Sequence, residues 1–275
     1  MKLFISADME GISGIVDPSY INPDQGKNYE RGRVFMTHDV NAVIEAAVEY
    51  GAKEILVADS HEKMTNLLIE RLHPKAILLC GSPRDFSMMQ GLDSSFDAAL
   101  FIGYHTRQGV PGVLSHTMSG VIRNLYINGQ VMGEFGFNAI YAALFGVPVC
   151  LVSGDDQVAQ EATALLPDIT AAVVKTAISR TSASCLSLQK SKEILAEKTK
   201  RALASIPDLA PLKVSLPLEL AIDFAHAGQA EMAAILPGTK HAAGTSTVSF
   251  TASDQFELYR AMRAMINLAG TAAFC

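Results

Sequence analysis

Short apolar runs alternate with longer amphipathic segments through about the first 175 residues of the chain. The first run, KLFISAD, covers residues 2–8. Residues 37–51 carry apolar side chains three or four positions apart, which predicts a helix with Thr37 at its N-cap and Gly51 at its C-cap. Further apolar runs, typical of buried strands, follow at 53–61, 76–81, 98–105, 147–156 and 169–175. Strands separated by helices predict an α/β fold with a mostly parallel sheet and helices on both faces.

The pattern changes in two places. Asn128 and Gly129 separate two short alternating runs, which predicts a β-hairpin beside the main sheet. After about residue 180 the chain alternates differently and predicts a smaller α+β unit: a helix at 187–206, a long strand at 211–224, a short helix at 228–236, a strand at 242–252 and a final helix at 253–270. We therefore expect an α/β metal-binding catalytic domain at 1–182, and a smaller domain at 183–275 that serves oligomerisation and completes the pocket.

Composition indicates an ordinary globular protein. Of the 275 residues, 49% are hydrophobic and 18% charged, which excludes a disordered chain. The net charge of −6, without long basic runs, argues against nucleic acid or an anionic membrane as a partner. No apolar stretch is long enough for a spanning helix or a secretory segment, so we expect a cytoplasmic protein. The cysteines stand singly, without a CxxC pair, and are interpreted as structural: Cys80, Cys150, Cys185 and Cys275.

Residue types that bind metals follow three of the predicted strands. Asp8 and Glu10 follow the first, Asp59 and His61 the second, and His105 the third. Ligands of open parallel sheets bind beyond the carboxyl ends of the strands, which meet at one edge. A single histidine at such a place is more often a hydrogen-bonded structural residue. Three strand ends with acidic or imidazole groups together favour a functional site.

The residue types also indicate the chemistry. Two carboxylates with two imidazoles suit Zn²⁺ or Mn²⁺ better than Ca²⁺ or Mg²⁺, which prefer oxygen ligands alone. Four or more such ligands can hold two metals with one carboxylate between them, as in two-metal hydrolases. The chain has no GxSxG, GxGxxG or GxxxxGK[ST] motif, so serine hydrolase, dinucleotide-binding and P-loop functions lose their usual support.

Other polar residues leave two interpretations open. Glu134 begins a predicted helix, where it is either a ligand or an acidic residue favoured by the helix dipole. His116 lies in a loop rich in glycine and serine and is either functional or an exposed surface residue. Asp155 and Asp156 follow a fourth apolar run, and helix capping is favoured over support of a metal ligand. The remaining histidines are interpreted as structural: His38, His73, His226 and His241.

The segment SADMEG, residues 6–11, matches the SxDxEG signature of the DppA-type D-aminopeptidases, a family of self-compartmentalising dinuclear zinc peptidases. The resemblance covers essentially the whole chain. It extends through NYERGR (28–33), DSHEKMTNL (59–67), GYHTRQGVPGVLSHTM (103–118), INGQVMGEFGFNA (127–139), VSGDD (152–156), VKTAISR (174–180) and the final FC. It implies a two-domain subunit in a homodecamer of two stacked pentameric rings, with active sites that face an internal channel.

The resemblance also implies roles for individual residues. Asp8 matches the carboxylate that bridges the two Zn²⁺ ions of each subunit, and His116 matches the catalytic histidine that is not a ligand. The full set of matched zinc ligands is Asp8, Glu10, His61, His105 and Glu134. The implied activity is a zinc-dependent aminopeptidase that removes the N-terminal residue of short peptides or amides, with D-Ala preferred.

Our hypothesis for the mechanism is that a metal-activated water attacks the scissile carbonyl, while His116 stabilises the oxyanion or protonates the leaving amine. Asp59 either orients the imidazole of His61 or caps the strand end. Arg180 either lines the pocket or belongs to a polar interdomain loop. Two alternative functions remain: a metal-dependent hydrolase of another amide or ester, and a dipeptide-binding transport component, which would need export or an anchor.

Overall fold

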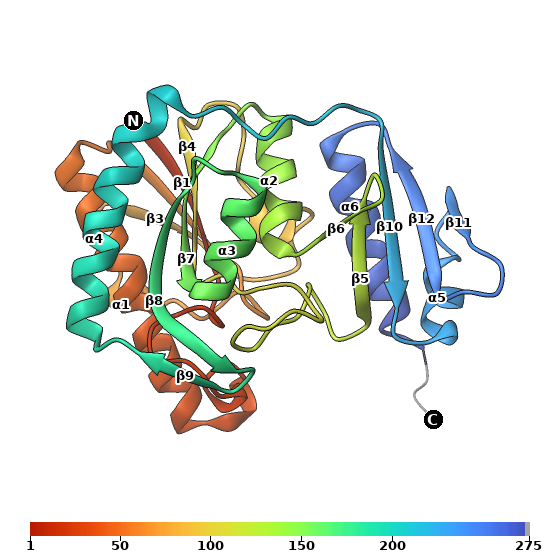
Figure 1. Ribbon diagram of the computed structural model, residues 1–275, viewed down its shortest axis with the longest axis horizontal. Helices are drawn as coiled ribbons and strands as arrows, with labels where there is room; N and C mark the ends of the chain where they lie inside the picture. The colour runs from red at the N-terminus through yellow and green to blue at the C-terminus, as the bar shows by residue number, and fades with distance from the viewer. Residues whose placement is uncertain (273–275) are drawn as a thin grey trace.

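A computed structural model describes residues 1–272 and shows two β-sheets side by side (Figure 1). The first sheet has the strand order β3-β2-β1-β4-β7-β8-β9. All neighbours pair in parallel except β8 and β9, which form an antiparallel hairpin at the edge. The strand bounds are β1 Lys2–Ala7, β2 Glu54–Asp59, β3 Ala76–Leu79, β4 Ala98–Ile102, β7 Val149–Asp155, β8 Thr170–Ser179 and β9 Ser182–Cys185.

Helices cover both faces of this sheet, as Figure 1 shows. On one face lie α1 (Lys27–Tyr50) and α4 (Leu188–Ser205), whose apolar residues share a core with Leu3 and Ile5 of β1. On the other lie α2 (Glu134–Leu144) and α3 (Asp156–Leu165), packed with Phe4. Successive residues of β1 thus point into opposite cores, which explains why Leu3, Phe4 and Ile5 are apolar without alternation.

The second sheet is antiparallel, with the order β11-β12-β10-β5-β6. Its strands are β5 Ile122–Ile127, β6 Gln130–Met132, β10 Leu218–Phe224, β11 Thr239–His241 and β12 Thr247–Ala252. Helices α5 (Ala227–Ala233) and α6 (Gln255–Ala269) pack on it, and α6 also contacts α2. The predicted fold class, a mostly parallel α/β sheet with a smaller α+β part, is confirmed. Short 3₁₀ helices cover Pro18–Tyr20, Pro23–Gln25, Ile69–Arg71, Ser87–Met89 and Ile206–Asp208.

Three local predictions can be compared with the structure. Gly51 is the C-cap of α1, with φ +112° and its N–H directed at the carbonyls of the last turn. The predicted N-cap at Thr37 is wrong, because the helix begins at Lys27 and Thr37 is buried inside it, where Oγ1 donates to the carbonyl of Arg33 at 2.8 Å. The predicted strand at 211–224 begins only at Leu218, because Pro211 and Pro217 have no N–H for a ladder.

The hairpin at Asn128 and Gly129 is confirmed, and it belongs to the second sheet, where β5 pairs with β10. This sheet therefore takes strands from both sides of the predicted domain boundary at 182/183. Conversely, α4 lies after that boundary and packs on α1 of the first sheet. The division into domains at 1–182 and 183–275 stays a prediction.

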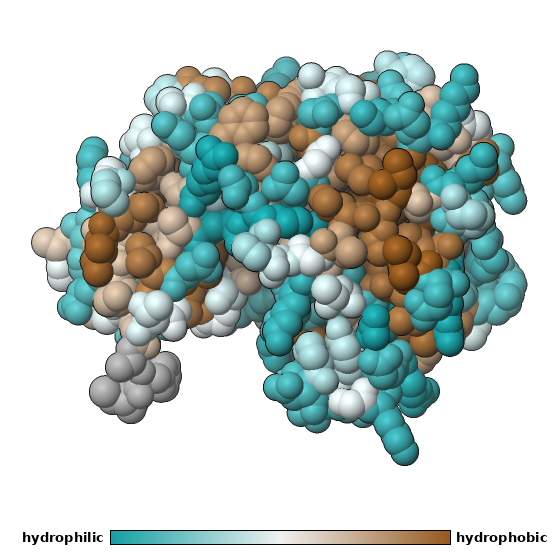
Figure 2. All heavy atoms as spheres, turned by 180° about the vertical axis from the view of Figure 1, so that it is seen from behind, coloured by the Kyte–Doolittle hydropathy of each residue, from teal (hydrophilic) through white to brown (hydrophobic). Residues whose placement is uncertain are grey.

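Seen from behind, a band of hydrophilic residues crosses the middle of the molecule, with hydrophobic residues on both sides of it (Figure 2).

Among the described residues, Cys80, Cys150 and Cys185 are free thiols, and burial raises the pKa of Cys150 to about 12. Cys275 lies outside the described residues. None of the described helices combines the length and apolar character that crossing a membrane requires.

Candidate metal centre

The strands that carry the predicted ligands are direct neighbours. β1 lies between β2 and β4, with Ala7 opposite Asp59 on one side and Ile102 on the other. Asp8 and Glu10 follow β1, His61 follows β2, and His105 follows β4. The same edge of the sheet therefore brings all four residues together. The structure thus confirms that these four residues lie together, while their role as metal ligands stays a prediction.

Glycines allow the loops after these strands to approach closely. The N–H of Asp8 donates to the carbonyl of Ile102 at 2.8 Å, and that of Gly11 to the carbonyl of Gly103 at 2.7 Å. A Cβ atom on Gly11 would lie 2.0 Å from the carbonyl oxygen of Tyr104, and one on Gly103, at φ +73°, 2.2 Å from that of Asp8. The glycine of the SADMEG motif is therefore required by backbone contact beside the site.

The side chains form two groups that share Asp8. In the first, Nδ1 of His61 lies 3.3 Å from Oδ1 of Asp8 and 3.1 Å from Oε2 of Glu10. In the second, Nε2 of His105 lies 3.4 Å from Oδ2 of Asp8 and 3.4 Å from Oε1 of Glu134. The donor atoms of each group lie within 4.8 Å of one another, as metal ligands must. Asp8 presents one oxygen to each group, which is the arrangement of a bridging carboxylate.

Backbone carbonyls orient the imidazoles. Nε2 of His61 lies 2.9 Å from the carbonyl oxygen of Ile21, and Nδ1 of His105 lies 2.9 Å from that of Thr106. An N–H donated to each carbonyl leaves the opposite nitrogen as the lone-pair donor that faces the carboxylates. Such contacts fix the tautomer of metal-bound histidines in proteins.

Glu134 is the first residue of α2, and its Oε1 accepts a hydrogen bond from the N–H of Met118 at 2.7 Å. The backbone beside His116 is thereby tied to the second group. Sequence reasoning alone left Glu134 open between a ligand and a helix-dipole acid. In the structure the two interpretations are compatible, because Glu134 is the first residue of α2 and its carboxylate also contacts His105.

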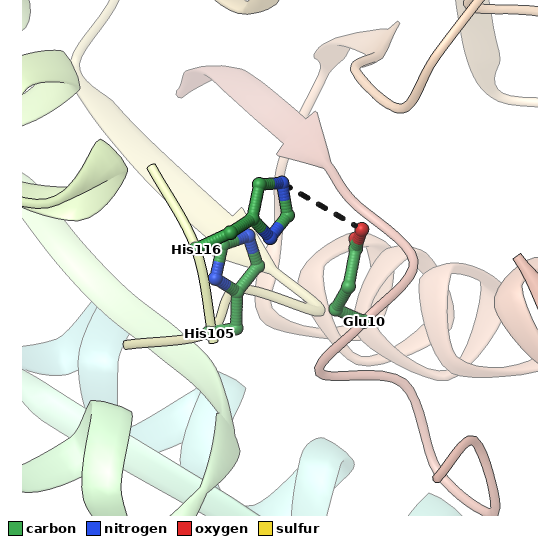
Figure 3. A group of neighbouring side chains, drawn as sticks. All are labelled: Glu10, His105 and His116. Atoms are coloured by element: carbon green, nitrogen blue, oxygen red, sulfur yellow. Dashed lines mark ion pairs between the residues drawn. The ribbon is translucent and has the colours of Figure 1, made fainter. Parts of the chain in front are cut away.

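His116 lies at the boundary between the cluster and solvent. Its side chain is 29% exposed, whereas those of the other five residues are at most 8% exposed. The ring stacks on His105 with 4.2 Å between centroids, and Nε2 lies 3.5 Å from Glu134 and 3.9 Å from Glu10. Figure 3 shows this ring beside His105, with Nε2 directed at Glu10. Nδ1 lies 3.1 Å from the carbonyl oxygen of Leu114, which fixes the orientation of the ring.

The electrostatics of the cluster favour a bound cation. Burial alone would lower the pKa of His61 and His105, but the neighbouring carboxylates raise it well above the usual value. Burial raises the pKa of Glu10, yet His61 and the other imidazoles hold it well below its ordinary range. Burial and the charge of Glu10 raise the pKa of Asp8. The buried carboxylates thus favour positive charge beside them, which a divalent cation would supply.

Three buried atoms of the cluster have only the ion-pair contacts given above and no well-directed hydrogen bond with any residue that the structure describes: Oδ2 of Asp8, Oε2 of Glu10 and Nε2 of His105. Buried polar atoms are normally satisfied, so unsatisfied ones need an explanation. Mixed oxygen and nitrogen donors of this kind fit zinc. The residues present thus fit a two-metal centre.

The cluster opens into a cavity of about 480 Å³. Its wall includes Glu62 and Ser119 from loops, and Met262 and Arg263 from α6. The second sheet and its helices therefore help to enclose a site whose metal-binding residues come from elsewhere in the chain.

Comparison with known proteins agrees with this geometry. The family model described as D-aminopeptidase matches residues 1–264. The chain belongs to the D-aminopeptidase family. It is 48% identical over 276 residues to the D-aminopeptidase of Bacillus subtilis (strain 168), with 100% of both chains covered. It also matches the solved structure of the Zn-dependent D-aminopeptidase DppA from Bacillus subtilis, which is described as a self-compartmentalizing protease. That match has a TM-score of 0.98 and 47% sequence identity, and it covers 100% of both chains.

In this member of the D-aminopeptidase family, Asp59 forms no hydrogen bond or ion pair with the imidazole of His61 within the described part of the chain. Its carboxylate accepts hydrogen bonds from the N–H groups of Asn66 and Leu67 at 2.6 and 2.7 Å. The side chain of Asn66 also donates to the carbonyl of His61 at 2.7 Å. Asp59 thus holds the loop that carries His61, which is closer to the strand-cap interpretation.

The acidic pair lies where β7 ends and α3 begins, and the first of the two residues caps the helix, as expected. Asp155 is the N-cap of α3, and its second oxygen accepts from the N–H of Val113 at 2.7 Å, which ties it to the loop before His116. Asp156 accepts from the N–H of Ala177 at 2.7 Å. Arg180 lines a separate cavity of about 520 Å³ rather than the one that opens from the cluster.

Sequence reasoning missed Lys175. Its buried ammonium donates to the carbonyls of Glu10, Ile12 and Ile15 at 2.5, 3.0 and 2.5 Å, and burial lowers its pKa to about 8. From β8, it therefore fixes the loop that carries Glu10. The signal in the sequence was a lysine at the end of an otherwise apolar run, ITAAVVK.

Proposed function

We propose that this protein is a zinc-dependent aminopeptidase that removes the N-terminal residue, preferably D-alanine, from short peptides or amides. The observation that carries the proposal is the pair of ligand groups that share Asp8 beside a cavity. Membership in the D-aminopeptidase family and the activity of the matched relatives support it.

The proposed ligands of two Zn²⁺ ions are Asp8, Glu10, His61, His105 and Glu134. Bound there, zinc would act as a Lewis acid on the substrate carbonyl and lower the pKa of a water molecule. The chain supplies the rest of the site. The carbonyls of Ile21 and Thr106 hold the two imidazoles, and the buried carboxylates balance the charge of the ions.

His116 is the proposed catalytic residue. Because Nδ1 lies against the carbonyl of Leu114, Nε2 is the atom that faces the cavity. A neutral imidazole there can accept a proton, and a protonated one can donate it to the leaving amine or stabilise an oxyanion. His116 also forms a third potential ligand group with Glu10 and His105, although it is more exposed than either. An experiment must therefore separate a catalytic role of His116 from a role as a metal ligand.

We also propose a homo-oligomeric assembly, a decamer, in the cytoplasm. A self-compartmentalizing relative supports the assembly. So do large apolar side chains that are exposed in the single chain, among them Ile178 (72%), Ile69 (69%) and Ile77 (66%). The proposed domain at 183–275 would complete the pocket within each chain, where α6 lines the cavity, and would contribute to the contacts between chains.

The test is metal content together with hydrolysis of D-alaninamide and L-alaninamide, before and after chelation and after zinc is restored. We expect about two zinc ions per chain and D-selective cleavage that chelation abolishes. Bound zinc without cleavage of either amide would favour a hydrolase of another amide or ester. Dipeptide binding without any hydrolysis would favour the transport alternative, which the matched relatives do not support. Absence of metal would refute the proposed centre.

A further inference from the structure

Helix α6 forms the wall of the cavity with one of its faces. Met262, Arg263, Ile266 and Asn267 all line the cavity, and their spacing places them on one side of a helix. The metal cluster contributes three carboxylates to the same cavity, those of Asp8, Glu10 and Glu134. Arg263 is the one arginine or lysine among the described residues that line it. The cavity therefore contains an anionic group of side chains and a single permanent cation.

Arg263 is half-buried as a residue, and its guanidinium has no carboxylate within 4.0 Å, nor any hydrogen-bond partner, among residues 1–272. Arg260, one turn earlier on α6, differs in this respect. It donates to Oδ2 of Asp85 at 2.9 Å and lies over the ring of Phe86. Within residues 1–272, one arginine of the helix is thus paired, and the donors of the other meet no partner.

Among the residues that the structure describes, none forms an ion pair with Arg263. Glu62 also lines the cavity but makes no ion pair with it. The nearby Arg84 has the same sign of charge: burial first, and then the charge of Arg263, lowers the pKa of Arg84. A partly desolvated guanidinium with free donors is suited to a carboxylate, which it can bind through two parallel hydrogen bonds.

We propose, building on the aminopeptidase function above, that Arg263 binds the free C-terminal carboxylate of a dipeptide substrate. A dipeptide carries a carboxylate on the residue that leaves, at the end away from the metal-bound carbonyl. The cavity of about 480 Å³ lies within the size range of small-ligand pockets. The preferred substrates are then dipeptides with a free carboxylate rather than longer peptides or amides, and Asn267, one turn further along the helix, lies beside the same carboxylate.

The test compares two compounds with the same scissile bond: D-alanyl-glycine, and D-alanyl-glycinamide, in which the carboxylate is replaced. The zinc-loaded wild-type enzyme should cleave the acid with the higher kcat/KM. Arg263→Met should lower kcat/KM for the acid about 10- to 100-fold, the usual effect of losing a hydrogen bond to a charged group, and change that for the amide less than about threefold. Arg263→Lys, which keeps the charge but loses the planar fork, should fall between them.

Arg260→Met is the matched control, because Arg260 belongs to the same helix, is paired with Asp85 and does not line the cavity. It should leave the ratio between the two compounds unchanged. Equal cleavage of acid and amide by the wild type, or an equal loss of both in Arg263→Met, would overturn the proposal. A general disturbance of α6 would give the second result.

Binding separates this inference from the proposed activity. Both compounds are titrated calorimetrically into zinc-loaded His116→Ala protein, with and without Arg263→Met. Tighter binding of the acid that depends on Arg263 supports the inference even if the wild type cleaves neither compound, a result that would refute only the aminopeptidase function. Equal affinity for acid and amide refutes the role of Arg263 whatever the activity.

Discussion

The number of zinc ions that each variant retains provides a sharp test of the centre, because the two ligand groups share one residue. Asp8 belongs to both groups, so Asp8→Ala should remove both ions. His105 is one of three donors in one group and none in the other, so His105→Ala should reduce the content from two ions to one. His116→Ala should keep both, since complete groups remain without it.

Activity should fall in all three variants but for different reasons. Asp8→Ala and His105→Ala lose metal and hydrolysis together. His116→Ala should keep its metal and lose about 10²- to 10⁴-fold in kcat, the range associated with a general acid or base. Added zinc should restore part of the activity of His105→Ala, because mass action refills a weakened site, and none of the activity of His116→Ala.

The assay is elemental analysis after dialysis against buffered free zinc, with circular dichroism to verify folding. His73→Ala is a suitable control, because His73 lies outside the cavity and its Nδ1 only accepts from the N–H of Lys75. Loss of one zinc ion in His116→Ala would refute our assignment and place His116 in the ligand group with Glu10 and His105. A fully active His105→Ala would refute the centre as a whole.

Two further predictions concern protons and backbone. The carboxylates raise the pKa of His61 and His105 well above the usual value despite burial, so zinc must displace a proton from each imidazole as it binds. The apparent zinc affinity of each group should then rise about tenfold per pH unit below that pKa, with proton release measured by calorimetry in two buffers, and a pH-independent affinity would contradict this. Gly103→Ala places a Cβ atom 2.2 Å from the carbonyl oxygen of Asp8, so this variant should lose zinc. Gly129→Ala is the control: its φ of +77° is similar, but a Cβ atom there would have nothing within 4 Å. It should lose only about 1 kcal/mol of stability, the cost of the left-handed backbone, and keep its zinc. Equal zinc content in the two glycine variants would show that close packing does not position Asp8.

The sequence determined the main sheet and most of the candidate site. Apolar runs of strand length, separated by helical patterns, require a parallel sheet covered on both faces, and the carboxyl ends of such strands meet at one edge. Asp8, Glu10, His61 and His105 were therefore expected together from their positions alone. Glu134 and His116 needed the family signature, because neither follows a strand of the main sheet. Local signals failed where context outweighed them: Thr37 resembles an N-cap, yet favourable packing extends α1 for ten residues before it.

Tertiary structure decided what depends on distant parts of the chain. The pairing of β5 with β10 joins segments almost a hundred residues apart, and no local pattern encodes that partner. Lys175 reaches the loop of Glu10 across some 165 positions, and Arg263 lines the same cavity as the cluster because α6 packs against both the second sheet and α2. The spacing of apolar residues along a helix or strand indicates which of its faces is buried, because that pattern belongs to the element alone. Which side chain meets which, and which charge stays unpaired, depends on how the elements pack in three dimensions.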